Sequence, residues 1–217
     1  AKKSFREVGG YILAESILSH EKKNLIFPAH DWLSTLFKKL HRKIISGEEI
    51  DITFVTLNYD RSLEYFFSKI TRYDCREDEE ELVGKVLAGI PVLHPHGSLG
   101  SLSELPFGES GDSRQAQKIR DAGRRIQIIS DKLEDSAAYT QAQKVLESSE
   151  KILFVGFAYH PSTLRALLSR VDPERTELIG TALNLSEERE KSVIEWSKSK
   201  IKLAPIEAND FIFQNIV

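Results

Sequence analysis

The stretch DITFVTLNYDRSLEYFF, residues 51–67, joins a run of strand-forming residues to a helical pattern through the polar triplet Asn58, Tyr59 and Asp60. The nearly continuous apolar run at 52–57 is typical of a strand that is covered on both faces, as in a parallel sheet. Ligands bind to such sheets outside the carboxyl ends of the strands, where the loops into the next helices diverge. The triplet therefore lies where a parallel sheet would hold a ligand.

Strand-like and helix-like segments alternate after this stretch, and two helical patterns at 4–20 and 30–45 precede it. Further strands are predicted at 91–96, 125–130, 151–157, 176–185 and 200–208, and helices from about Asp60, at 80–90, 136–149, 161–171 and 186–199, and at the end of the chain. This alternation predicts an α/β fold with a doubly wound, Rossmann-like parallel sheet. We expect residues 1–50 to form a helical leader or small helical subdomain, residues 51–217 to form the Rossmann-like domain, and the Gly- and Ser-rich segment 97–113 to be a loop.

Composition restricts the class of protein. A chain of 217 residues with 41% hydrophobic and 29% charged residues can form one sizeable domain. Its longest apolar run, at 152–159, is far short of the roughly 18 residues of a membrane span. The single cysteine, Cys75, can form neither an internal disulfide nor a four-cysteine zinc site, so we expect a protein of the reducing cytoplasm without zinc.

Charge argues against nucleic acid as a partner. The net charge is -3, and the densest charge run, REDEEE at 76–81, is acidic and typical of a solvated helix face. The basic segment at 114–125 is likewise expected to be a solvated helix face rather than a phosphate site. The sequence has no methionine, so we expect either a fragment or a sequence from which methionines and some segments are missing. Motifs therefore carry more weight than the intervals between them.

Four predicted strands end in polar or glycine-containing segments, and parallel strands would bring these ends to one edge of the sheet. The segments contain Asn58 and Asp60, then His94 and His96, then Gly156 to His160, and finally Asn184 and Ser186.

Each segment also has an ordinary structural explanation. Asp60 or Asn58 can cap the following helix, which is the commonest role of such residues at that place. His96, followed by Gly and Ser, can belong to a turn. Gly156 can be a point of close packing, and Asn184 can lie at another helix start.

Together, these segments resemble one family. FVTLNYDRSLE (54–64) resembles the T-x-N-x-D strand end of sirtuin-like proteins, in particular the TTNYDxxLE form of bacterial antiviral defence systems. VLHPHGSLG (92–100) resembles their LHGS segment. KILFVGFAYHPSTL (151–164) resembles the strand with the G-x-G or GTS turn, and ALNLSEERE (182–190) resembles the strand that reaches the adenosine. The order and strand context of all four agree over residues 51–208.

The resemblance implies roles for individual residues. His96 would be the catalytic histidine, and Asn58 would orient the nicotinamide ribose or the attacking water. His94 is the alternative catalytic histidine; period-two alternation would place it on the same face as His96, as a supporting partner. Further contacts to NAD are implied for Thr56, Asp60, Gly97, Ser98, Gly156, Phe157 and Asn184.

The residue types fit cleavage of the bond between nicotinamide and ribose. This reaction releases a neutral leaving group and builds positive charge on the sugar, so a positioned amide and a base with a pKa near neutrality suffice. The resemblance therefore implies an NAD⁺ hydrolase, serving as an antiphage defence effector domain. The alternative is a module that binds NAD or ADP-ribose as a signal without turnover.

Two departures from the family affect this interpretation. The glycine-rich turn that wraps the pyrophosphate is not found, and we expect its segment to lie before Ala1 or outside the sequence as given. The cysteine pairs of the zinc ribbon are missing, which makes an NAD-dependent protein deacylase the least favoured function. The expected partners are NAD and a protein trigger or an additional domain outside this chain, with a homo-oligomer left open; neither a membrane nor nucleic acid is expected.

Overall fold

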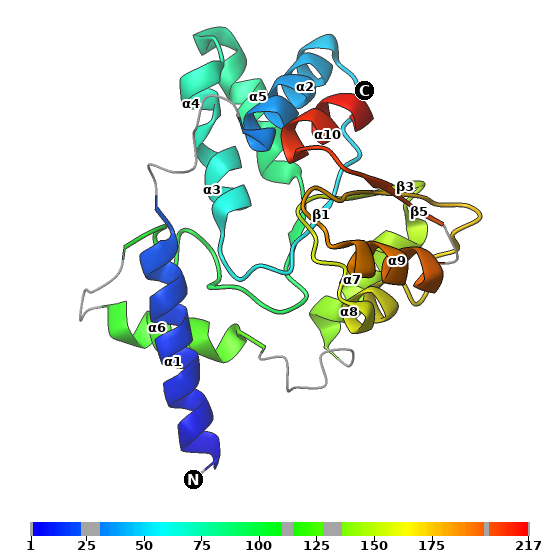
Figure 1. Ribbon diagram of the computed structural model, residues 1–217. Helices are drawn as coiled ribbons and strands as arrows, with labels where there is room; N and C mark the ends of the chain where they lie inside the picture. Colours follow the sequence, from blue (N-terminus) through cyan, green and yellow to red (C-terminus); the bar gives the residue numbers. More distant parts are fainter. Residues whose placement is uncertain (1, 23–30, 110–114, 128–135, 198–199, 217) are drawn as a thin grey trace. The chain divides into compact units, whose positions relative to one another are not determined.

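The computed structural model describes residues 2–22, 31–109, 115–127, 136–197 and 200–216 (Figure 1). Over these ranges the protein is mixed α/β, with ten helices and two small parallel sheets. Contacts group the chain into two compact units. The first comprises residues 1–28 and 41–139, and the second comprises residues 29–40 and 140–217.

The sheet of the first unit has two strands, β1 (Phe54–Val55) and β2 (Val92–Leu93). They pair in parallel, with Phe54 opposite Val92 and Val55 opposite Leu93. The Thr56 N–H extends the pairing by donating to the Leu93 carbonyl at 2.9 Å. Both strands are half-buried, so the prediction of a strand covered on both faces is wrong for 52–57. Pairing stops at Leu93, because the chain turns over the next four residues, His94 to Gly97.

Helices make up most of the first unit. Their bounds are α1 (Lys2–His20), the end of α2 (Trp32–Ser46), α3 (Ser62–Lys69), α4 (Thr71–Asp74), α5 (Glu77–Gly89), α6 (Ala116–Arg125) and the start of α7 (Ala137–Ser148). The helix predicted from about Asp60 and that at 80–90 correspond to α3 and α5. The basic segment forms α6, whose charged residues are mostly exposed.

Helices α1 and α6 lie across each other in Figure 1, and they pack extensively. Gly10 and Gly123 meet at the crossing, where a Cβ added to Gly10 would lie 2.7 Å from the Gly123 carbonyl oxygen. Around them is an apolar cluster that includes Ala14, Leu18, Leu99, Leu105, Ile119, Ala122 and Ile126. The two glycines allow the backbones to approach, and the cluster closes one side of the strand end described below.

The sheet of the second unit has the order β3-β4-β5, with all pairs parallel. The strands are β3 (Lys151–Phe154), β4 (Glu177–Thr181) and β5 (Ile201–Ala204), and α8 (Pro161–Leu167), α9 (Glu187–Trp196) and α10 (Ala208–Asn215) follow them in turn. Crossovers of one hand between sequential neighbours place α8 and α9 on the same face. In Figure 1 these two helices lie on one side of the strands and α10 lies on the other.

The predicted strand at 125–130 is the clearest difference from the sequence pattern. Arg125 is the last residue of α6, and Ile126 and Gln127 are not in a strand. Residues 128–130 lie outside the described residues, as do 110–113 of the predicted loop. Among the described residues of this segment, Gln127 makes a main-chain hydrogen bond, because its N–H donates to the His96 carbonyl at 2.8 Å.

Within the described ranges, every helix is too short or too polar to cross a lipid bilayer.

Candidate functional site

A tight turn follows β2 and carries both predicted histidines. The Gly97 N–H donates to the His94 carbonyl at 2.9 Å, with Pro95 at the second position of the turn and Gly97 at the fourth, as is typical of type I turns. Gly97 has a φ of 80°, and a Cβ at this position would clash with the Arg125 carbonyl. Because the chain turns here, the two histidines do not alternate along a strand, and that prediction is wrong.

His94 holds the ends of the strands together. Its Nδ1 lies 2.8 Å from the Asn58 carbonyl oxygen, and its Nε2 lies 2.9 Å from Glu64 Oε1 on α3. Burial of the ring is the largest single influence and lowers the pKa of His94. The hydrogen bonds to Glu64 and Asn58, with the charges of Glu64 and Asp60, outweigh burial and raise that pKa above its usual value.

His96 has a different environment. Its ring contacts the rings of Tyr59 and Tyr139, with centroid distances of 6.4 Å and 6.3 Å. Burial lowers the pKa of His96, although a hydrogen bond to the Leu57 backbone opposes this. His96 is therefore neutral at pH 7 and able to accept a proton.

Asn58 and Asp60 differ in what they contact. The Asn58 residue is exposed, and its side chain makes no hydrogen bond within the described part of the chain. Its N–H donates to Thr56 Oγ1 at 3.2 Å. Asp60 Oδ1 accepts from the Ser62 N–H at 3.1 Å, in a turn that leads into α3, whose N-cap is Arg61 without a side-chain cap. Asn58 is thus open to a ligand, whereas Asp60 already has a structural partner.

The remaining predicted residues of this strand end lie in its turns. Ser98 Oγ accepts from the Gly100 N–H at 3.2 Å. The Tyr59 hydroxyl donates to the Gln127 carbonyl at 3.0 Å, and burial raises the pKa of Tyr59. Gln127 therefore joins both sides of His96, since its N–H binds the His96 carbonyl.

A buried ion pair next to the triplet was not predicted. The Arg61 and Glu21 side chains are both fully buried, and Arg61 Nη2 lies 2.6 Å from Glu21 Oε2. Arg61 Nε also donates to Glu21 Oε1 at 3.0 Å, and Nη1 donates to the carbonyls of Ser101 and Leu105. The pair ties the end of α1, the start of α3 and the segment 101–105 together. The only sequence signal is an arginine directly after Asp60.

The second unit has its own strand ends, at β3 and β4. Gly156 has a φ of 60°, and its N–H donates to Thr181 Oγ1 at 3.0 Å. A Cβ at Gly156 would meet no atom within 4 Å. Glycine is therefore favoured here by the backbone conformation and not by close packing. Asn184, with a φ of 60°, is exposed beyond β4.

An aromatic group supports these ends. Tyr159, completely buried, has a φ of 51°, and its hydroxyl donates to the Thr181 carbonyl at 2.9 Å. Burial raises the pKa of Tyr159. Phe157 lies against its ring in an edge-on contact with centroids 5.3 Å apart. The cap of α9 is Ser186, whose side chain accepts from the Arg189 N–H, rather than Asn184.

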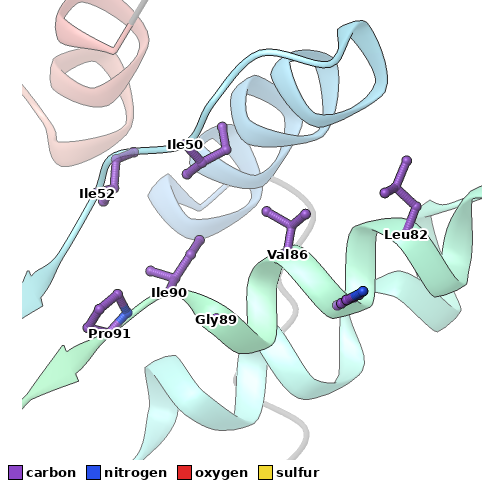
Figure 2. Close-up of a pocket in the computed structure, with 8 residues that line it drawn as sticks. Ile50, Ile52, Leu82, Val86, Gly89, Ile90 and Pro91 are labelled. Atoms are coloured by element: carbon purple, nitrogen blue, oxygen red, sulfur yellow. The ribbon is translucent and has the colours of Figure 1, made fainter.

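A hollow lies elsewhere in the first unit. It is an open, mostly apolar groove of about 440 Å³, and its lining residues are Ile50, Ile52, Leu82, Lys85, Val86, Gly89, Ile90 and Pro91. Figure 2 shows Ile50 and Ile52 facing Val86 and Ile90 across it. Because Ile52 and Pro91 precede β1 and β2, the groove lies at the amino ends of the strands. Asn58 and His94 follow the carboxyl ends, where ligands bind parallel sheets.

Comparison of the chain with known protein families, curated proteins and solved structures gives no match. Among the described residues, no group of three or more His, Cys, Asp and Glu side chains is placed to hold a metal ion. The chemistry of the site therefore has to be inferred from its geometry.

Proposed function

We propose that this protein is an NAD⁺ hydrolase that cleaves the bond between nicotinamide and ribose, with Asn58 and His96 as its catalytic residues. The observation that carries the proposal is the contrast at the end of β1 and β2. His96 is half-buried with a lowered pKa and is hydrogen-bonded to the backbone of Leu57, the residue before Asn58, which is exposed and whose side chain has no partner in the described residues. A neutral imidazole and a free amide are the two groups that this reaction needs.

The roles follow from the chemistry. As the glycosidic bond breaks, positive charge develops on the ribose, and a water or a ribose hydroxyl must be held beside it. The Asn58 amide can donate to and accept from such a hydroxyl. His96 takes up the proton that the hydroxyl loses, which its lowered pKa permits at pH 7. Tyr59 and Tyr139 limit the access of water to the imidazole.

The rest of the proposal rests on the sirtuin-like motifs. It includes a doubly wound, Rossmann-like sheet, which the parallel pairing of all strands in the described residues supports. It also includes an antiphage defence role. Gly156, Phe157 and Asn184 stay predicted contacts of NAD, and the exposed left-handed backbone of Gly156 and Asn184 supports a role in binding.

The test is release of nicotinamide from NAD by the full chain, alone and with candidate triggers, beside His96→Ala and Asn58→Ala. We expect each substitution to lower kcat by about 10²-fold to 10⁴-fold, the usual contribution of a positioned acid or base. The matched control is His20→Ala, because His20 is exposed at the end of α1, where its Nδ1 contacts the Ser16 carbonyl. It should leave release unchanged.

Circular dichroism and thermal unfolding must first establish that the variants are folded. If the wild-type chain binds NAD and releases no nicotinamide with any trigger, hydrolysis is refuted and a binding module takes its place. NAD consumption that requires an acyl-lysine peptide would instead identify a deacylase.

A further inference from the structure

The His94 side chain is enclosed by acceptors. Only 8% of the side chain is exposed. Nδ1 faces the Asn58 carbonyl oxygen at 2.8 Å, and Nε2 faces the Glu64 carboxylate at 2.9 Å. A carbonyl and a carboxylate accept hydrogen bonds and do not donate them. Both ring nitrogens must therefore carry hydrogen, which makes His94 an imidazolium.

This imidazolium joins three elements. Asn58 follows β1, His94 follows β2, and Glu64 lies in the first turn of α3. The Oε2 atom of Glu64 is buried without a hydrogen-bond partner in the described residues, so the carboxylate has no polar contact there that competes with His94. A buried, unpartnered oxygen is costly, and the charge of His94 offsets that cost.

The contact reaches Asn58 through the main chain. His94 holds the carbonyl of the residue whose amide is exposed at the strand end. Fixing this peptide group limits the directions in which the Asn58 side chain can point. His94 is therefore placed to orient Asn58 without touching a substrate.

We propose that His94 is the positioning residue for Asn58: clamped between the Asn58 carbonyl and Glu64, it holds the asparagine in the orientation that acts on NAD. The inference rests on the proposed hydrolase function and assigns the first histidine of the HPH segment a role distinct from that of His96. The charged groups that face His94 in the described residues are Glu64 on α3 and Asp60 before it.

The clamp makes activity depend on pH in a defined way. When His94 loses a proton, one nitrogen becomes an acceptor facing an acceptor, and that contact opens. The raised pKa of His94 places this loss above the usual histidine value of about 6.5. Nicotinamide release should therefore decrease at high pH, where His94 loses its proton. It should also decrease at low pH, where His96, whose pKa is lowered, gains a proton.

The Glu64→Gln variant removes the negative charge of Glu64 and keeps the shape of its side chain. With an amide in place of the carboxylate, a neutral His94 can still donate from Nδ1 to the Asn58 carbonyl while its Nε2 accepts from the amide N–H. We expect Glu64→Gln to keep kcat at pH 7 and to lose the alkaline decline. Glu64→Ala and His94→Ala should lower kcat by roughly 10²-fold, as expected of a misplaced catalytic group, with a much smaller change in KM.

A double-mutant cycle tests whether His94 acts through Asn58. In the Asn58→Ala background, His94→Ala should have no further effect on nicotinamide release. A full effect in that background, or an unchanged kcat for His94→Ala, would overturn the inference while leaving the hydrolase function intact.

The protonation state has its own measurement. The ¹⁵N chemical shifts of His94 at pH 7 should show both ring nitrogens protonated, and Glu64→Gln should convert the ring to the neutral Nδ1–H form. A neutral His94 in the wild-type chain refutes the clamp regardless of activity. If the wild-type chain releases no nicotinamide although His94 is charged, the proposed function fails, and the positioning role fails with it.

Discussion

The carboxyl ends of the two sheets are built in different ways. In the first unit, charged and polar side chains shape the end of β1 and β2, through the His94–Glu64 contact and the buried Arg61–Glu21 pair. In the second unit, positive-φ backbone at Gly156, Tyr159 and Asn184, together with the neutral hydrogen bonds of Thr181 and Tyr159, shapes the ends of β3 and β4.

Because of this difference, the two strand ends are suited to different tasks. Side chains that titrate or carry charge can move protons and orient water, so the end of β1 and β2 is suited to chemistry. Left-handed backbone near a strand end can present main-chain groups to a ligand, and these groups do not titrate. The ends of β3 and β4 are therefore suited to binding. Substitutions at the first end should therefore have larger and more pH-dependent effects than those at the second.

The largest expected effect is at the buried ion pair. Arg61→Ala leaves the fully buried Glu21 carboxylate without its cation, and should lower the free energy of unfolding by about 3–5 kcal/mol. Urea denaturation measures this loss. Arg124→Ala, which removes the exposed contact of Arg124 with Glu7, is the control and should change stability by less than about 1 kcal/mol. Equal effects of the two variants would contradict the assigned importance of the buried pair.

The next comparison is between the stability effects of substituting one glycine at each strand end. Gly97→Ala adds left-handed strain of about 1–2 kcal/mol and a main-chain clash with Arg125, worth about 1–3 kcal/mol. Gly156→Ala adds only the strain, since a Cβ there meets nothing within 4 Å.

Both glycine variants are measured by urea denaturation. Gly47→Ala, with a φ of 77° and open space around it, is a second strain-only control in the first unit. If Gly97→Ala costs no more than these controls, the close approach of Arg125 to the turn is wrong.

Sequence periodicity predicted the kinds of element well and their extents poorly. Most helices and the parallel strands β3, β4 and β5 lie where the apolar spacing placed them, whereas α4 was not predicted and α6 was expected only from the charge of its segment. The run at 52–57 stays apolar beyond β1, but only Phe54 and Val55 of this run lie in a strand. The strand predicted at 125–130 failed at its start because α6 continues to Arg125.

The site was predicted in part for a similar reason. Motifs placed Asn58 and His96 near the ends of β1 and β2 from local sequence, and their catalytic roles stay predictions. The partners of Arg61 and His94 could not be read in this way, because Glu21 lies 40 residues before Arg61 and Glu64 lies 30 residues before His94. Such contacts depend on the packing of whole helices, which no short motif records.

A smaller effect is expected from the aromatic support of the second unit. Tyr159→Phe removes the hydrogen bond to the Thr181 carbonyl in a fully buried setting, and should lower the free energy of unfolding by about 1 kcal/mol. The loss should not vary between about pH 6 and 9, because the pKa of Tyr159 is raised by burial above the usual tyrosine value of about 10. A pH-dependent loss would show that a titrating group acts at this end too, against the comparison of the two ends.

The last comparison concerns pH and stability at the first strand end. The pKa of His94 is raised in the folded state, so its stabilising contribution is complete below the unfolded value of about 6.5 and is lost as pH rises through the folded pKa. The pKa of His96 is lowered, so its effect lies below about pH 6.5, where stability falls as pH falls.

The two histidines therefore affect stability over separate pH ranges. The His94→Gln variant keeps His96 and so isolates the effect in the higher range. The difference in unfolding free energy between the wild-type chain and this variant should shrink as pH rises above about 6.5, measured by urea denaturation in steps of pH. Because both chains retain His96, its contribution cancels in the difference. A difference that is constant over this range would mean that His94 is neutral in the folded protein, and the first strand end would then lack the charge that sets it apart from the second.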